Sequence, residues 1–187
     1  YFKKPEVYEL SVDEDGWFCT GDVCKLDKYN QMTIVDRVKN FFKLSNGKFI
    51  AAEKIENSYM ANSVLVEQMF VTGDSLNPFI IAIVGLNLEN LASHISKIAP
   101  GIRFNFKALS KEINSGTRGE AYKSFLNLVN DRSVKRALLQ FLNRSMKHAD
   151  LAGYEYIKNA YFDILPFSVV ADTLTPTLKI KRPIVNQ

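Results

Sequence analysis

The longest apolar run in the chain is the feature that most constrains its fold. Eight consecutive residues, from Phe79 to Leu86, carry no polar side chain. A membrane-spanning helix takes about 20 apolar residues, so this run is too short to cross a membrane. It has the length of one β-strand, and a strand that is apolar on both sides is typical of a position buried on both faces. The run therefore predicts a sheet that other elements cover.

A hairpin and three more strands are predicted around this run. Phe41–Leu44 and Lys48–Ala51 are separated by Ser45-Asn46-Gly47. Because Asn-Gly readily adopts the positive φ angles of a tight turn, these two runs predict a hairpin. The other strands are expected at Met32–Asp36, at Glu67–Thr72 and at Tyr156–Leu165, the last ended by Pro166.

Apolar residues at helical spacing predict one helix at Ala52–Asn62, with Ile55 and Tyr59 on one face, and three helices between residues 87 and 150. Residues 1–30 are expected to form loops with short strands, and the tail 174–183, with two prolines and three cations, a loop. This order of elements predicts an α+β fold with a small mixed β-sheet packed with helices. The faces of the three later helices contain Leu88, Leu91, Ala92 and Ile95; Ala121, Phe125, Leu128 and Val129; and Val134, Ala137, Leu138, Phe141, Leu142 and Ser145.

Composition narrows the functional classes only slightly. The chain has 187 residues, 47% of them hydrophobic, and a net charge of +4, which suits either a phosphate-rich ligand or an ordinary solvated surface. Its two cysteines, Cys19 and Cys24, fit no zinc pattern and are too few for a disulfide scaffold. A reducing compartment is therefore expected, either the cytoplasm or a cytosol-facing membrane surface.

Residues 15–39, which read DGWFCTGDVCKLDKYNQMTIVDRVK, contain the most specific motif. This segment resembles, without a gap, the signature of the long-chain fatty-acid–CoA ligases, a family of adenylate-forming enzymes. Asn30 replaces a glycine of the pattern and can supply the same left-handed turn. The matching positions are Asp15, Gly16, Trp17, Thr20, Gly21, Asp22, Ile34, Asp36, Arg37 and Lys39, and the other departures are Cys19, Cys24, Leu26 and Lys28.

Three more segments resemble motifs of the same family, in the same order along the chain. They are residues 1–6 (YFKKPE), residues 42–57 (FKLSNGKFIAAEKIEN), and residues 166–168 (PFS) with 174–182 (LTPTLKIKR). Any one of them alone is a weak signal, whereas four in order over nearly the whole chain make a specific match.

The resemblance implies a domain organisation and an activity. Residues 1–38 correspond to the last segment of a large N-terminal AMP-binding domain, and residues 39–187 to a mobile C-terminal domain. The implied function is that of part of an ATP-dependent fatty-acid–CoA ligase, which forms acyl-AMP and then acyl-CoA from a long-chain fatty acid. ATP with Mg²⁺ and the co-substrate CoA are the implied cofactors, bound mostly by the N-terminal domain. The fragment alone is expected to be inactive.

The resemblance also assigns roles to individual residues. Lys179 is the expected catalytic lysine of acyl-AMP formation, Asp22 and Arg37 are expected to bind the nucleotide, and Lys39 is expected to be the hinge. No metal ligand is expected within the chain. The expected CoA path, used in thioester formation, contains Lys43, Ser45, Asn46 and Gly47.

Each role competes with a plainer reading of the same residues. Asp22 could belong to a polar turn, Arg37 to a surface ion pair, Lys39 to a solvated loop, and Lys179 to a basic tail; the hairpin could carry no function. For the whole chain, the alternatives are another acyl- or aryl-CoA ligase of the superfamily and a non-catalytic interaction module. A nucleic-acid partner is not expected, because no nucleic-acid-binding motif is present. The acyl chain length, the membrane anchoring, the organelle and the oligomeric state stay open.

Overall fold

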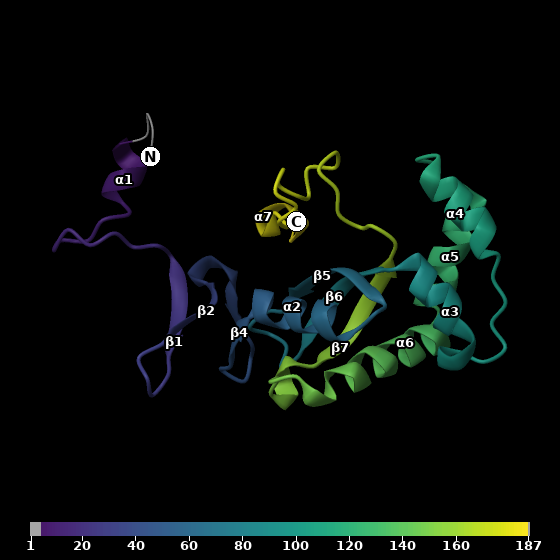
Figure 1. Ribbon diagram of the computed structural model, residues 1–187, viewed down its shortest axis with the longest axis horizontal. Helices are drawn as coiled ribbons and strands as arrows, with labels where there is room; N and C mark the ends of the chain where they lie inside the picture. The colour runs from purple at the N-terminus through teal and green to yellow at the C-terminus, as the bar shows by residue number, and fades with distance from the viewer. Residues whose placement is uncertain (1–4, 187) are drawn as a thin grey trace.

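A three-stranded mixed sheet lies at the centre of the protein (Figure 1). The computed structural model describes residues 5–186, so the part of the first motif at positions 1–4 lies outside the described residues. The strands β5 (Val66–Thr72), β6 (Ile80–Leu86) and β7 (Ile157–Asp163) lie in the order β5-β6-β7. β5 is antiparallel to β6, and β7 is parallel to it. The predicted small mixed sheet is therefore confirmed.

The apolar run forms the middle strand, as predicted, but its burial is not uniform. Ile80 and Val84 are fully buried, whereas Ile81 is 40% exposed and Phe79 precedes the strand. The expectation of a strand buried on both faces is thus correct for most of β6 and wrong at Ile81, whose face of the sheet is partly open.

The parallel pair of β6 and β7 requires a long crossover connection, which helices provide. These are α3 (Leu88–Ile98), α4 (Phe106–Asn114), α5 (Glu120–Asn130) and α6 (Arg132–Ser145), followed by the short 3₁₀ segments η2 (Met146–His148) and η3 (Gly153–Glu155). The apolar spacing predicts three helices here, and α4 was not predicted. α4 packs on the core through the fully buried Leu109 and the partly buried Phe106 and Ile113. Ala92 of α3 is exposed, although it was expected on the apolar face of that helix.

The core lies between the sheet and its helices. α2 (Ala52–Asn62) packs on β5, with Ile55 and Tyr59 fully buried as the helical spacing predicts. The Tyr59 hydroxyl donates a 2.5 Å hydrogen bond to Oδ1 of Asn143, which ties α2 to α6. Because a buried hydroxyl without a partner is costly, this bond fixes the two helices relative to each other.

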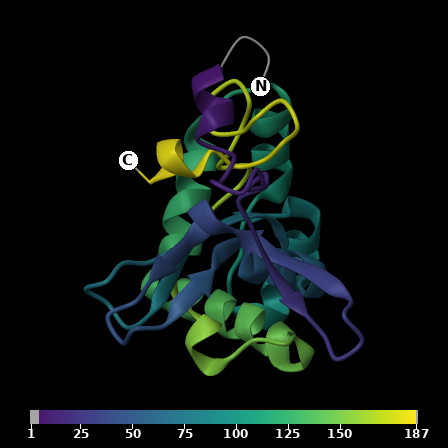
Figure 2. The same ribbon diagram turned by 90° about the vertical axis from the view of Figure 1, so that its left-hand side faces the viewer.

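The segment before α2 consists of small pieces, of which α1 and the first hairpin extend away from the central sheet (Figures 1 and 2), whereas the second hairpin packs on the core through Leu44 and Ile50. A short helix α1 (Pro5–Glu9) stands where only loop and short strands were expected. The first hairpin is built from β1 (Asp22–Leu26) and β2 (Met32–Arg37), and the second from β3 (Phe41–Lys43) and β4 (Phe49–Ala51). The 3₁₀ segment η1 (Val38–Asn40) connects the two hairpins. The predicted strand at 32–36 and the predicted hairpin at 41–51 are both confirmed.

The tail that follows β7 returns over the sheet (Figure 1). Phe167 and Leu174 pack on Phe70 of β5 in a small apolar cluster. Leu174 and Ile180 form an isolated antiparallel bridge, and the chain ends in the helical turn α7 (Arg182–Val185). The tail was expected to be a loop. This prediction is correct up to residue 181, apart from the bridge, and wrong from Arg182, where α7 begins.

Candidate functional site

The two residues expected to bind the nucleotide lie directly opposite each other on the first hairpin. Asp22 of β1 pairs in register with Arg37 of β2, and Nε of Arg37 lies 2.8 Å from Oδ1 of Asp22. The Arg37 side chain is 60% exposed and that of Asp22 20% exposed. The pair therefore offers a guanidinium with free N–H groups and a carboxylate oxygen on one accessible edge. The ion pair considered for Arg37 exists, and its partner is Asp22.

Asp36, next to this pair, has a structural task that the sequence analysis does not assign. Its buried carboxylate accepts hydrogen bonds from the backbone N–H of Arg37, from Nδ2 of Asn40 and from the backbone N–H of Glu53. These bonds tie the end of β2 to η1 and to the first turn of α2. A carboxylate is stable at a buried position only when donors surround it, as they do here.

Lys39 lies in the middle of η1, the three-residue link between the hairpins. Arg37 and Phe41 on either side have extended backbone angles, with φ of −79° and −75°. The backbone N–H of Val38 donates a 2.8 Å hydrogen bond to the carbonyl of Gly21. The Lys39 side chain is exposed, and a hinge requires only that the backbone of the link can rotate. The hinge role stays a prediction.

The turn of the second hairpin is tightly built, in agreement with the Asn-Gly signal. Gly47 has a φ of +82°, and its N–H donates to the carbonyl of Leu44. Ser45 donates its N–H to the carbonyl of Asn77, which attaches the turn to the β5–β6 loop. Asn46 caps the backbone N–H of Lys48, and Nζ of Lys43 lies 5.6 Å from the ring centroid of Phe49. The role of this turn in thioester formation stays a prediction.

Lys179 is presented by a closed turn of the tail. The backbone N–H of Thr175 donates to the carbonyl of Lys179, and the N–H of Lys179 donates to Oγ1 of Thr175. Leu178 adopts a φ of +61° within this turn. Lys179 is exposed, and among residues 5–186 none of the ion pairs involves it. A backbone-fixed turn with a free ammonium group can deliver a positive charge to an anion.

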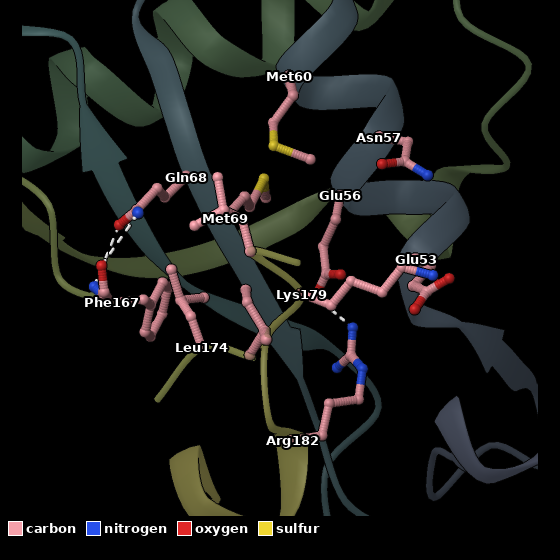
Figure 3. A pocket seen from close by; sticks show the side chains of 12 residues that line it. Glu53, Glu56, Asn57, Met60, Gln68, Met69, Phe167, Leu174, Lys179 and Arg182 are labelled. Atoms are coloured by element: carbon pink, nitrogen blue, oxygen red, sulfur yellow. Dashed lines mark hydrogen bonds and ion pairs between the residues drawn. The ribbon is translucent and has the colours of Figure 1, made fainter. Parts of the chain in front are cut away.

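Lys179 lines a pocket of about 360 Å³ between α2 and the tail (Figure 3). Neither Asp22 nor Arg37 belongs to this pocket, so the structure does not bring the expected catalytic lysine and the expected nucleotide-binding pair together. The remaining lining comes from α2, β5 and the tail: Glu53, Glu56, Asn57, Met60, Gln68, Met69, Phe167, Leu174, Leu178, Ile180 and Arg182.

Two charged residues of this pocket form a contact that sequence analysis misses. Nη2 of Arg182 lies 2.5 Å from Oε1 of Glu56, and both side chains are almost completely buried. The same Oε1 accepts the backbone N–H of Val71 at 2.7 Å. Burial raises the pKa of Glu56 from its usual 4.5 to about 7, although the neighbouring Arg182 acts in the opposite direction. The partners are 126 positions apart in the sequence, so no local pattern identifies the pair.

Comparison with known proteins identifies relatives of almost the whole chain. The chain is 39% identical to the peroxisomal acyl-CoA ligase 891 of Penicillium roqueforti over 98% of its length and 24% of that protein's. It is 37% identical to long-chain-fatty-acid–CoA ligase 5 of Rattus norvegicus and 38% identical to ligase 1 of Homo sapiens, each over 23% of the relative. The chain therefore spans about a quarter of the length of these curated relatives. No protein-family model matches it.

Solved structures with the same fold are parts of adenylate-forming enzymes. The adenylation domain of a carboxylate reductase from Mycobacterium chelonae aligns with the whole chain at a TM-score of 0.73 and 27% identity, over 24% of that domain's chain. The corresponding domain from Segniliparus rugosus, solved with AMP and a co-purified carboxylic acid, aligns at a TM-score of 0.71 and 30% identity, over 24% of its chain. The α+β fold predicted from the order of elements is thereby confirmed.

Proposed function

We propose that this chain, which is related to the long-chain fatty-acid–CoA ligases, is the carboxy-terminal part of an ATP-dependent ligase of that kind. The observation that carries the proposal is the 37–39% identity with acyl-CoA ligases over nearly the whole chain. Residues 1–38 would complete the large nucleotide-binding domain, and residues 39–187 would form the smaller mobile one. The separate first hairpin and its link η1 to the rest of the chain are consistent with this division (Figure 1).

The reaction has two steps with different electrostatic demands. In the first, an oxygen of the fatty-acid carboxylate bonds to the α-phosphorus of ATP, and the bond to pyrophosphate breaks. In the second, the CoA thiolate bonds to the acyl carbon and AMP leaves. The first step brings two anions together, so fixed positive charge beside the attacked phosphorus lowers its barrier most. The free ammonium group of Lys179 is the charge that this chain would supply.

The nucleotide would be held by the Asp22–Arg37 pair. A carboxylate can accept hydrogen bonds from both ribose hydroxyl groups, and the exposed N–H groups of Arg37 can donate to ribose or phosphate oxygens. The ion pair between them, with Nε and Oδ1 2.8 Å apart, orients both groups before ATP arrives. Within residues 5–186, no group of three or more His, Cys, Asp or Glu residues is placed so that it could hold a metal ion.

The second step would use another face of the mobile domain. Rotation about Lys39 would remove Lys179 from the phosphate and bring the turn at Lys43 and Ser45–Gly47 toward the nucleotide. This turn is rigid enough to form one wall of a CoA path, because its backbone is bonded internally and to Asn77. The adenylation domains of carboxylate reductases share the fold, so an adenylation domain that does not use CoA is the second candidate, and formation of acyl-CoA distinguishes the two.

Location and partners follow from the same proposal. The substrates would be a long-chain fatty acid, ATP and CoA, and the setting the cytoplasm or a membrane surface that faces it. One relative is peroxisomal by name, which adds the peroxisome as a second setting to test. None of the helices within residues 5–186 has the length and apolar character needed to cross a membrane.

Lys179→Ala in the full-length protein tests the proposal. Pyrophosphate release from ATP and fatty acid is expected to fall about 10²–10³-fold, the cost of one well-placed charge. Supplied acyl-AMP and CoA are expected to react at nearly the parent rate, because Lys179 has left the site by then. Lys181→Ala removes a neighbouring charge that pairs with Asp172 and is the matched control. Equal damage from both variants, or intact pyrophosphate release without Lys179, contradicts the proposal.

A further inference from the structure

The turn that carries Lys179 lies in a tail segment that several contacts attach to the rest of the domain. At its start, the side chain of Gln68 exchanges two hydrogen bonds with the backbone of Phe167, each 3.1 Å long (Figure 3). At its end, Arg182, which follows Lys179 by three positions, is bound to α2 and β5. Between these attachments, Leu174 and Ile180 also pack on the apolar cluster around Phe70, whereas Val170 is exposed. The polar attachments at the two ends therefore act together with this apolar contact in holding the turn.

The attachment at Arg182 has three separate contacts with two elements. Nη2 bonds to the Glu56 carboxylate on α2, and Nη1 donates a 3.1 Å hydrogen bond to the carbonyl of Val71 on β5. The guanidinium also lies 5.0 Å from the ring centroid of Phe70. Glu56 completes the arrangement by accepting the N–H of Val71. A planar guanidinium is needed for this set, because its N–H groups point at two acceptors while its face covers a ring.

The position of Arg182 limits where Lys179 can lie. Three extended residues span at most about 10 Å, so the Lys179 backbone cannot move far from a fixed residue 182. Lys181, one residue earlier, pairs with the exposed Asp172 of the same tail and contacts neither α2 nor β5 through that pair. The two contacts differ in burial: the Arg182 and Glu56 side chains are 12% and 6% exposed, whereas that of Asp172 is 70% exposed.

We propose that Arg182 and Glu56 are positioning residues for the adenylation step. Their ion pair holds the tail on α2 and β5, which places the Lys179 ammonium group beside the attacked phosphate. This inference rests on the proposed function and adds two residues to it. The thioester-forming step does not use Lys179, so it does not depend on this attachment. A purely structural pair would serve both steps equally.

The decisive variant is Arg182→Met in the full-length protein, which removes the charge and retains a long side chain. A misplacement of about 1 Å can cost about 10²-fold in rate, so we expect pyrophosphate release to fall between about 10- and 100-fold in kcat. The reaction of supplied acyl-AMP with CoA should stay within about twofold of the parent rate. Arg182→Lys, which keeps the charge without the fork, should recover part of the loss. Lys181→Met is the matched control and should leave both steps unchanged.

Glu56→Gln provides a second test that keeps an acceptor for Val71. It should slow pyrophosphate release in the same selective way, and adding it to Arg182→Met should cause little further loss, because both act through one contact. Equal slowing of both steps by Arg182→Met and Glu56→Gln, or pyrophosphate release within twofold of the parent in both, overturns the inference. Lys179→Ala separates the two proposals: if it abolishes adenylation while the Glu56 and Arg182 variants do not, only the positioning role is wrong.

Discussion

At the scale of single residues, Glu56 is a buried carboxylate that lines the same pocket as Lys179. Its carboxylate is 5% exposed and contacts Arg182 and the Val71 N–H. Burial opposes the charged form more strongly than these partners favour it, and the pKa is raised to about 7. Glu56 therefore gains its charge on α2 only near neutral pH.

This raised pKa predicts a pH-dependent stability. Between pH 4.5 and about 7 the unfolded chain has lost the Glu56 proton while the folded chain still holds it, so the stability contributed by Glu56 falls as the pH rises through this range. The cost approaches about 3 kcal/mol above pH 7. Glu56→Gln removes this dependence, so its stability relative to the parent should rise from pH 4.5 to 7.5. Urea unfolding of the 187-residue chain at several pH values measures the difference.

Glu14→Gln is the matched control for this prediction, because Glu14 lies on an exposed loop before β1. Its stability should follow the parent at every pH. A Glu56→Gln difference that stays constant between pH 4.5 and 7.5 would mean that the Glu56 carboxyl titrates at its ordinary pKa in the folded state.

Side-chain contacts between distant residues are the part of the structure that the sequence predicts least well. Resemblance to a family identifies Asp22, Arg37 and Lys179 as individual positions, and the structure adds the ion pair between the first two. The contacts of Glu56 with Arg182 and of Asp36 with Glu53 were not predicted. Such pairs depend on how distant segments meet in space, and the sequence patterns used for prediction describe only near neighbours along the chain.

At the scale of elements, a helix or strand is predicted more accurately when its sequence pattern is clearer. β6, α2 and the hairpin of β3 and β4 were predicted nearly to the residue, because their apolar spacing or turn residues are strong local signals. α4 was missed although Phe106, Leu109 and Ile113 recur at helical spacing and pack on the core. Its stripe is short, and its start depends on Asn105, whose side chain accepts the N–H of Ala108.

The prediction for a single element concerns the link η1, which contains the expected hinge residue Lys39. Lys39→Pro fixes φ near −65° and restricts Val38 before it, so the link should lose freedom to rotate between two arrangements. Adenylate formation, followed by pyrophosphate release, should survive better than thioester formation from supplied acyl-AMP. Lys39→Ala keeps a rotatable backbone and should affect neither step strongly. Equal loss of both steps in Lys39→Pro, or no loss, places the hinge elsewhere.

At the scale of the whole molecule, the first hairpin and the loop before it expose several large apolar side chains. Trp17, in the loop before β1, is 74% exposed, and Tyr29, Met32 and Ile34 of the hairpin are also largely accessible. An exposed apolar patch on a small hairpin is typical of a surface that another part of a protein covers. In the proposed assignment the large nucleotide-binding domain covers it, which agrees with a chain that spans about a quarter of its relatives.

This assignment predicts that the 187-residue chain folds but does not turn over. It contains Lys179 and the Asp22–Arg37 pair, yet these do not share a pocket, and the pocket that Lys179 lines measures only about 360 Å³. Catalysis of the first step requires the cation, the nucleotide and the acyl carboxylate to be held within bonding reach of one another. With ATP, palmitate and CoA, the isolated chain should therefore form no acyl-CoA above the uncatalysed background, while circular dichroism and a cooperative urea transition report a folded domain. The full-length protein, assayed in parallel, should form acyl-CoA. Turnover by the pure 187-residue chain would contradict the division at residue 38, because all the walls of the active site would then have to lie within this chain.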